Sequence, residues 1–466
     1  MDSPPRPASS MNGTTSSLNR VFFQGTPSVL LIRWFAFLIL IGTLLLMLPW
    51  AHARDRVGPL DALFTSASAV CVTGLTVVDT GRDFTLFGQL VILLLIQLGG
   101  LGILTFAGLA FQMFGARMPV ASESAIGDSL FQQSVAADLK SWLKSTVKIT
   151  LLIEGAGAAL LFFSLAPGGQ LPHSAFSAAF HSVSAFCNAG FSLYSNNLCG
   201  LRENIPFVGT IMILIVLGGI GHIVLLEASR ACKNYRRSEA LPAPFRFSFH
   251  SRVAIRITVA LILTGALGLG LFDWLDGRPT EGGFFAGSLF QSITARTAGF
   301  NTISISALPP ASILLLICLM FIGGSPGSCA GGIKTTSFAL ALARIVAGIR
   351  NRKEVSLMGR ALPDALISRA VALIGLALLW NAFGAMLLAV TEFGHASVAD
   401  VLFEQTSAFG TVGLSTGITP HLTTIGRIWI VLTMFAGRIG PLTLAFSFVA
   451  PSRSNVSYPE GKVMIG

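Results

Sequence analysis

The sequence predicts an all-α polytopic membrane protein in which eight transmembrane helices form four tandem helix–loop–helix repeats. Three observations predict this fold class. Of the 466 residues, 53% are hydrophobic and only 11% are charged, whereas soluble domains carry about 25% charged residues. Eight segments are long and apolar enough to cross a bilayer. Four short segments between them resemble one another.

The composition also excludes other classes of protein. A soluble protein of this length cannot cover its surface with so few charges, and a disordered chain would be far less hydrophobic. The 6 cysteines are sparse for a secreted disulfide scaffold. Their spacing predicts neither a disulfide pair nor a zinc site.

The eight expected helices define the organisation of the chain. Their ranges are 28–50, 85–114, 142–166, 204–229, 251–275, 309–349, 368–391 and 425–450. The four repeats then occupy residues 28–115, 142–231, 250–349 and 368–450. Flexible cytoplasmic tails are expected at 1–27 and 451–466, and cytoplasmic linkers at 116–141, 232–249 and 350–367.

The net charge of +10 is concentrated in two connectors on one side of the expected membrane. Residues 229–256 contain seven Lys or Arg, and residues 344–369 contain six. Basic short loops stay in the cytoplasm. Both termini are therefore expected on the cytoplasmic side of the plasma membrane, here a bacterial inner membrane. Such clusters also suit the docking of a cytoplasmic partner or an anionic lipid, and these roles are compatible with topology.

The four loop segments form an internal repeat. In each, an aromatic residue at the second position is followed by Ser or Thr on a short helical stretch, and then by a Gly that precedes a large apolar residue. They are LFTSASAVCVTGLT at 63–76, AFHSVSAFCNAGFS at 179–192, LFQSITARTAGFNT at 289–302 and LFEQTSAFGTVGLS at 402–415. Non-helical backbone inside a membrane is tolerated only where protein or a wet cavity surrounds it. Four re-entrant loops around one axis, a pseudo-fourfold pore, satisfy this condition. In the third loop the aromatic residue and the Gly are one residue closer together than in the other three, and we expect the geometry of this loop to differ.

A second repeat supports this register. Gly-rich breaks occur at residues 99–102, 218–221, 323–327 and 437–440, which lie 25, 28, 24 and 24 residues after the loop glycines. Close packing of membrane helices explains many glycines. It does not explain their recurrence at this interval.

The loop strands have the composition of a cation filter. Backbone carbonyls can replace the hydration shell of a monovalent cation when the strand is extended and unobstructed. The Thr411-Val412-Gly413 strand closely resembles the TVG core of potassium-channel filters. The strands lack carboxylates, which argues against a divalent-cation channel. The candidate ligands are Val72, Thr73, Gly74, Asn188, Ala189, Gly190, Thr297, Ala298, Gly299, Thr411, Val412 and Gly413.

On these four loops, including the third strand at 296–302, the chain resembles the Trk/Ktr/HKT superfamily of potassium transporters. The single helix before the first loop makes it similar to the eight-helix Ktr membrane subunit. The resemblance implies potassium uptake, and Gly74 at the first filter position implies potassium preference. It also implies a homodimer and a cytoplasmic nucleotide-binding ring that senses ATP, ADP or NAD. Sodium stimulation, and symport against channel-like conduction, stay open.

The long sixth span predicts a gate. Its middle is rich in helix-breaking residues, which predicts a helix interrupted by an intramembrane loop rather than a passive kink. The loop resembles the gating loop of the family, which lies under the filter. Charges at membrane depth should face water or a partner, and Arg438 is expected below the filter, holding the loop. The candidate gate residues are Gly323, Gly324, Ser325, Pro326, Gly327, Ser328, Gly331, Gly332, Lys334 and Arg438.

Four further ionisable residues fall within the expected membrane region. Arg296 and Glu404 either pair with each other or, as we prefer, have separate partners. Glu154 and His222 lie inside expected helices, where a functional role and a structural hydrogen bond are both open.

Two other function classes fit the sequence less well. A membrane enzyme needs a convergent polar site, and the 7 His are scattered. A secondary transporter with broken helices, for another substrate or for sodium, usually shows two inverted halves rather than four parallel repeats. The GGIKTTS string at 331–337 lacks the spacing of a phosphate-binding loop. We therefore expect no bound cofactor and no nucleic-acid partner.

Overall fold

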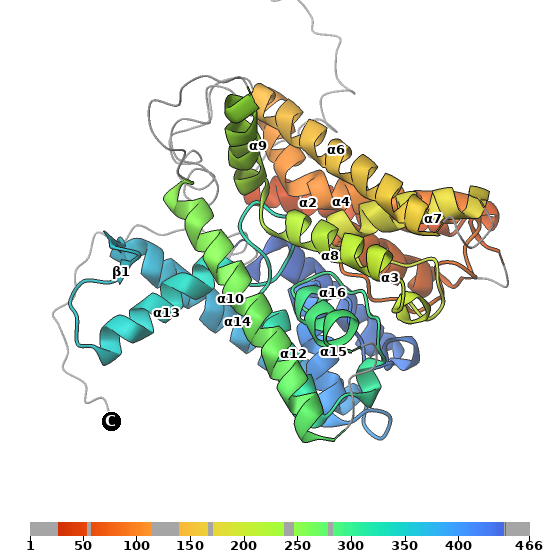
Figure 1. Cartoon of the computed structure of the whole chain (residues 1–466). Helices are drawn as coiled ribbons and strands as arrows, with labels where there is room; N and C mark the ends of the chain where they lie inside the picture. Colours follow the sequence, from red (N-terminus) through yellow and green to blue (C-terminus); the bar gives the residue numbers. More distant parts are fainter. Residues whose placement is uncertain are drawn as a thin grey trace, which may run out of the picture.

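The computed structural model describes residues 27–53, 57–113, 139–165, 171–236, 247–277, 283–441 and 443. In sequence order these residues repeat one pattern four times: a long helix, a short helix, an extended segment and a second helix (Figure 1). The expected tails, residues 444–450 of the last span and much of the first two linkers lie outside the described residues.

The long and short helices of the four repeats have the following bounds. The first helices are α2 (Pro27–Leu46), α6 (Leu139–Leu165), α10 (Phe249–Leu275) and α14 (Asp364–Thr391). The short helices are α3 (Pro59–Val70), α7 (Leu171–Phe186), the η5 and α11 pair (Phe284–Leu289 and Phe290–Thr294) and α15 (Val398–Gly410). The second helices are α4 (Leu86–Met113), α8 (Ile205–Gly219) with α9 (His222–Arg236), α12 (Pro310–Phe321) with α13 (Thr335–Ile349), and α16 (Thr424–Ile439). Short 3₁₀ turns are η1 (Pro49–Ala51), η4 (Cys199–Leu201), η6 (Ile305–Ala307) and η7 (Thr419–His421).

The first helix of each repeat is an uninterrupted apolar rod. Among the described residues, α2, α6, α10 and α14 are the four helices that are long and apolar enough to cross a membrane on their own. Only 22–39% of their most apolar windows is buried within the chain. They therefore form the outer, lipid-facing layer of a polytopic membrane protein.

Two of the four second helices are interrupted, whereas α4 runs unbroken through the Gly-rich residues 99–102, where the sequence had suggested a break. The α8–α9 pair bends by 104°, and α12 is separated from α13 by residues 322–334. The interruption of the sixth span agrees with the expectation from sequence. Within the expected span at 204–229, the chain breaks at the Gly-rich residues 218–221 that the sequence marked, where Gly221 takes a φ of 100° and turns the chain sharply after α8.

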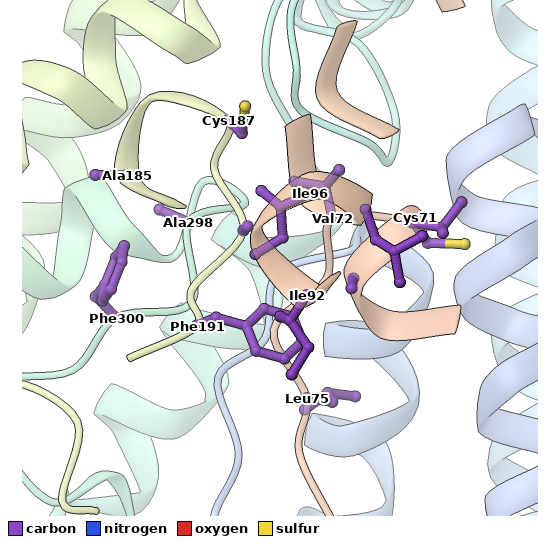
Figure 2. Close-up of a cluster of buried hydrophobic side chains, with 14 of the residues drawn as sticks. Cys71, Val72, Leu75, Ile92, Ile96, Ala185, Cys187, Phe191, Ala298 and Phe300 are labelled. Atoms are coloured by element: carbon purple, nitrogen blue, oxygen red, sulfur yellow. The ribbon is translucent and has the colours of Figure 1, made fainter. Parts of the chain in front are cut away.

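The core forms where the short helices meet. The aromatic residues that open the four loop repeats, Phe64, Phe180, Phe290 and Phe403, are all fully buried. Figure 2 shows side chains of the first three loops gathered in one cluster, with Phe191 of the second loop beside Ile92 of α4. Burial of large apolar side chains thus holds the loops together at the centre of the molecule.

The third short helix differs from the others. Residues Phe284–Leu289 form a π-helical turn before the single α-helical turn of α11. This is the repeat whose loop is one residue shorter, and π-turns are uncommon features that often occur near functional sites.

A small hairpin lies beyond α13. Strands β1 (Ser356–Leu357) and β2 (Arg360–Ala361) pair antiparallel, joined by Met358 and Gly359, which both have positive φ. Such a two-residue turn matches the twist of a hairpin. The hairpin follows α13, in teal at the side of the molecule in Figure 1.

Candidate functional site

Each re-entrant loop ends in a turn with the same pair of left-handed residues. A non-glycine residue with positive φ is uncommon, yet one occurs at the equivalent position of all four loops, two residues before the loop glycine. These residues are Val72, Asn188, Thr297 and Thr411, with φ of 57°, 59°, 77° and 49°. The glycines that follow are Gly74, Gly190, Gly299 and Gly413, with φ of 92°, 68°, 75° and 92°. The sequence repeat is therefore also a backbone repeat.

The four glycines form a closed ring. A Cβ atom on Gly74 would lie 2.3 Å from the carbonyl oxygen of Ala189 in the next loop. The same relationship joins Gly190 to the Ala298 oxygen at 2.8 Å, Gly299 to the Val412 oxygen at 2.4 Å, and Gly413 to the Thr73 oxygen at 2.1 Å. The fourth loop thus meets the first, and no side chain fits at any of the four positions. The filter residues predicted from sequence come together in this ring.

A hydroxyl group braces each strand of the ring from within its own loop. Ser184, Thr294 and Ser407 donate hydrogen bonds to the carbonyl oxygens of Phe191, Phe300 and Leu414, at 2.8, 2.7 and 2.6 Å. In the first loop, the Gly74 N–H donates to the Ser68 hydroxyl at 3.0 Å. The backbone repeats the brace: Thr73, Ala189, Ala298 and Val412 each donate to the carbonyl of the bracing residue. These bonds fix a strand that has no sheet partner.

A second hydroxyl ties three of the short helices to the outer layer. Ser66, Ser182 and Ser292 donate to the carbonyl oxygens of Ile39, Glu154 and Ile262, at 2.8, 2.6 and 2.8 Å. In the fourth loop the equivalent residue is Gln405, which accepts a hydrogen bond from Trp429 at 2.9 Å. The ring is therefore fourfold in its backbone but not in its side chains.

The segment between α12 and α13 packs directly against the ring. Ile322 and Ile333 form a parallel bridge at its neck. A Cβ atom on Gly331 would lie 2.2 Å from the Thr411 hydroxyl, and one on Gly323 would lie 3.3 Å from the Thr297 methyl group. Most of the segment is buried. Residues 322–334 are called the gate segment below.

Arg438 joins the gate segment to the first repeat. Its side chain is only 3% exposed. It donates to the carbonyl oxygen of Cys329 in the gate segment and, at 2.6 Å, to the carbonyl oxygen of Gly99 in α4. A buried guanidinium needs such acceptors to offset its loss of water. The predicted contact between Arg438 and the loop is present.

Two more side chains hold the gate segment. His222, at the start of α9, contacts the Gly327 carbonyl through both its backbone N–H at 2.9 Å and its ring Nδ1 at 2.8 Å. Arg296 donates to the Gly323 carbonyl at 3.2 Å and lies 3.5 Å from the Thr258 hydroxyl. The segment is therefore held from the second, third and fourth repeats.

The remaining predicted residues are placed as follows. Lys334 precedes α13, and its ammonium donates to Ala330 within the gate segment. Glu404 accepts hydrogen bonds from Ser415 and Thr419, so Arg296 and Glu404 have the separate partners that we preferred. Glu154 accepts from Gln97 at 3.2 Å, which fits the structural role.

Sequence reasoning missed the roles of His222 and Arg296 in holding the gate segment. Both were recognised as ionisable groups at membrane depth, and that was the only signal available. Their acceptors are backbone carbonyls 105 and 27 residues away. A backbone acceptor leaves no mark on the sequence. The bracing Ser and Thr had a visible signal, because they recur in every loop.

Residues 24–458 match the TrkH family of cation transport proteins. The chain is 37% identical over 447 residues to the Ktr system potassium uptake protein B of Bacillus subtilis, covering 95% of this chain and 97% of that protein. It is 34% identical over 457 residues to the potassium/sodium uptake protein NtpJ of Enterococcus hirae, covering 96% and 99%. The crystal structure of the potassium transporter TrkH from Vibrio parahaemolyticus matches with a TM-score of 0.68 at 20% identity, over 91% of this chain and 84% of that chain.

The structural match shows a shared fold, and the family match covers nearly the whole chain. The resemblance drawn from the four loops is therefore confirmed, and the family is one of transporters rather than enzymes. Four braced loops, a glycine ring and nearly full-length relatives lead to one conclusion: this chain is a multi-pass membrane protein of the TrkH family of cation transport proteins.

Proposed function

We propose that the chain takes up potassium across the plasma membrane through the glycine ring. The observation that carries this proposal is the closed ring of Gly74, Gly190, Gly299 and Gly413, in which each glycine lies against the carbonyl of the next loop. A ring of backbone carbonyls without carboxylates suits a dehydrated monovalent cation. The bound ions would contact the twelve filter residues named from the sequence, and the potassium uptake named for the Bacillus relative supports the choice of ion.

The gate segment is proposed to close this path. It packs against Thr297 and Thr411, directly next to the ring, and its glycines and serines suit a segment that must move. Arg438 would hold it closed and repel resting cations. Opening would then require the hydrogen bonds to Cys329 and Gly99 to break.

The chain is proposed to be the ion-translocating subunit of a regulated Ktr- or Trk-type system. Such a subunit would form a homodimer, with one path in each protomer, and would bind a cytoplasmic ring that senses ATP, ADP or NAD. The basic connectors support cytoplasmic termini, because loops rich in Lys and Arg stay inside. Potassium is then the transported ion, and no cofactor is bound by this chain.

Uptake in a host that lacks its own potassium transporters tests the proposal. The full chain should restore growth at low potassium and rubidium uptake, and the Gly190→Ala variant should restore neither, because its Cβ would clash with the Ala298 carbonyl. Both proteins must be found in the membrane at equal amounts. Absence of rescue by the full chain, with its regulatory partner co-expressed, would refute the proposal.

A sodium-carrying function is the second candidate. It is favoured by the name of the Enterococcus relative, which includes sodium. The two broken helix pairs also fit a secondary transporter of another substrate. Competition decides among them: excess potassium should block rubidium uptake by the chain, and equal sodium should not. Equal block by both ions would favour the sodium reading.

A further inference from the structure

A cavity lies away from the ring, between α10, α13 and strand β1. Its volume is about 220 Å³. The inner wall consists of aliphatic side chains: Ile257 of α10, and Ala339, Leu342, Ala343 and Val346 of α13. Apolar cavities tend to stay dry, so hydrocarbon is a better occupant of this wall than water.

The rim of the same cavity is basic. Arg350 and Arg352 line it, together with Glu354 and Ser356. Both arginines are exposed, and within the described part of the chain neither forms an ion pair with a carboxylate. One carboxylate against two guanidinium groups leaves the rim with a net positive charge, which suits a phosphate group.

The cavity lies where the apolar surface of α13 ends. Ile345 and Ile349 are 57% and 82% exposed, and the next residues, 350–353, include three basic side chains. In a membrane protein, this change from exposed aliphatic to basic side chains marks the boundary between hydrocarbon and headgroups. The apolar wall thus faces the acyl region and the arginine rim the headgroup region.

The side of the cavity formed by the β1–β2 hairpin is held in place by contacts within the chain. The hairpin is tied to α13 through Val355, which is 2% exposed and packs with Ala347 and Ile367. Arg360 of β2 also stacks on the ring of Phe249 at the start of α10, 5.5 Å from its centroid. The hairpin therefore bridges α13 and α10, and the cavity does not depend on a ligand for its shape.

We propose that this cavity binds one anionic phospholipid, with its phosphate on Arg350 and Arg352 and the start of an acyl chain along Ile257, Ala343 and Val346. The occupant combines an anionic head with an apolar tail, as the rim and wall require. Lipid bound here would link the outer helix α10 to α13, which continues directly from the gate segment.

The test uses the full-length protein in detergent, with native mass spectrometry and thermal unfolding as readouts. The probes are phosphatidylglycerol, phosphatidylcholine and inorganic phosphate. Wild-type protein should retain one phosphatidylglycerol in preference to phosphatidylcholine. Arg350→Gln with Arg352→Gln should weaken retention about tenfold or more, because both basic residues near the anionic headgroup are then lost.

Two further variants distinguish a built site from general surface charge. Ala343→Phe should fill the cavity and reduce retention with the charges intact. Arg344→Gln removes an exposed arginine of α13 that does not line the cavity and should leave retention unchanged. If Ala343→Phe fails to fold, the double arginine variant still decides.

Four results would overturn the proposal. The double arginine variant could retain the lipid as well as the wild type does. Alternatively, Arg344→Gln could lose as much lipid as the double variant, which would mean a diffuse charge effect. Inorganic phosphate could stabilise the protein as much as the lipid does, which would mean an anion site. Ala343→Phe could change the mass of the assembly instead of lipid retention, which would mean that a second copy of the chain covers the cavity.

Discussion

Asp61 and Arg427 form a salt bridge between Oδ1 and Nη1 at 2.7 Å, although 366 positions separate them in the sequence. Asp61 lies in the first turn of α3, in the first repeat, and Arg427 lies at the start of α16, in the last. The ends of the repeat array are therefore joined by this salt bridge, as well as within the ring.

The salt bridge should contribute little to stability. Its side chains are 22% and 24% exposed, so a double-mutant cycle of Asp61→Asn and Arg427→Gln should give a coupling of about 0.2–1 kcal/mol. Arg427→Gln alone should cost more than Asp61→Asn, because Arg427 also donates to the Leu422 and Pro420 carbonyls. Chemical unfolding in detergent measures both, and a larger loss for Asp61→Asn would contradict the prediction.

The glycine ring should tolerate no side chain. Gly413→Ala would place a Cβ 2.1 Å from the Thr73 carbonyl oxygen, and we expect rubidium uptake to fall about tenfold or more because the carbonyl ring must open. Gly394→Ala is the matched control. Its φ of 83° is similarly left-handed, but nothing lies within 4 Å of its Cβ. An equal loss of rubidium uptake in both variants would mean that the loss is caused by backbone strain and not by the close approach to the Thr73 carbonyl.

Arg438→Ala should increase ion flux. The change removes the hydrogen bonds from the gate segment at Cys329 and from α4 at Gly99. Thermal stability should fall at the same time, because buried carbonyls lose their donors at about 1–3 kcal/mol each. Unchanged or lower uptake in a well-expressed variant would count against a holding role. Arg438→Lys separates charge from geometry, since one ammonium keeps the charge but cannot match the guanidinium fork.

His222 should act on the same gate. His222→Leu removes the ring donor to Gly327, and basal rubidium uptake should rise by a smaller factor than in Arg438→Ala, because the backbone N–H of residue 222 still binds Gly327. His222→Asn keeps a side-chain donor and should stay near wild type. Since both residues hold one segment, the double variant with Arg438→Ala should be non-additive. Full additivity would show that they act on separate elements.

The bracing hydroxyls should set filter selectivity. Ser407 donates to the Leu414 carbonyl at 2.6 Å and accepts from the Gly413 N–H at 3.2 Å, so Ser407→Ala leaves both groups unpaired. We expect a loss of about 1–3 kcal/mol in stability and weaker discrimination of rubidium against sodium. Ser407→Thr keeps the hydroxyl and should restore both. If selectivity is unchanged in Ser407→Ala, the Ser407 hydroxyl stabilises the loop without setting the selectivity.

The sequence predicted the loops well because each constraint there is local. A buried aromatic, a bracing hydroxyl and a left-handed glycine must occur at fixed spacing, as in Phe403, Ser407 and Gly413. The gate segment was also predictable, since a string of glycine, serine and proline cannot continue a helix.

Other features depend on distant contacts that no local pattern encodes. The 104° bend after Gly219 is stabilised by the contact of His222 with Gly327, which belongs to another repeat. The sequence marked Gly218–Gly221 as a break but could not give its angle. The hairpin at 356–361 has two residues in each strand, too few for an alternating pattern to appear.

Because the ring is made by one chain, each substitution changes only a quarter of it. The equivalent left-handed positions are occupied by Val72, Asn188, Thr297 and Thr411, and their side chains have different contacts. Asn188 lies 3.4 Å from the Thr297 hydroxyl, and Thr411 lies against Gly331. A ring assembled from four identical subunits would have to repeat any such change four times. Fusion of the repeats lets one quadrant change its side-chain contacts while all four keep the same left-handed backbone turn.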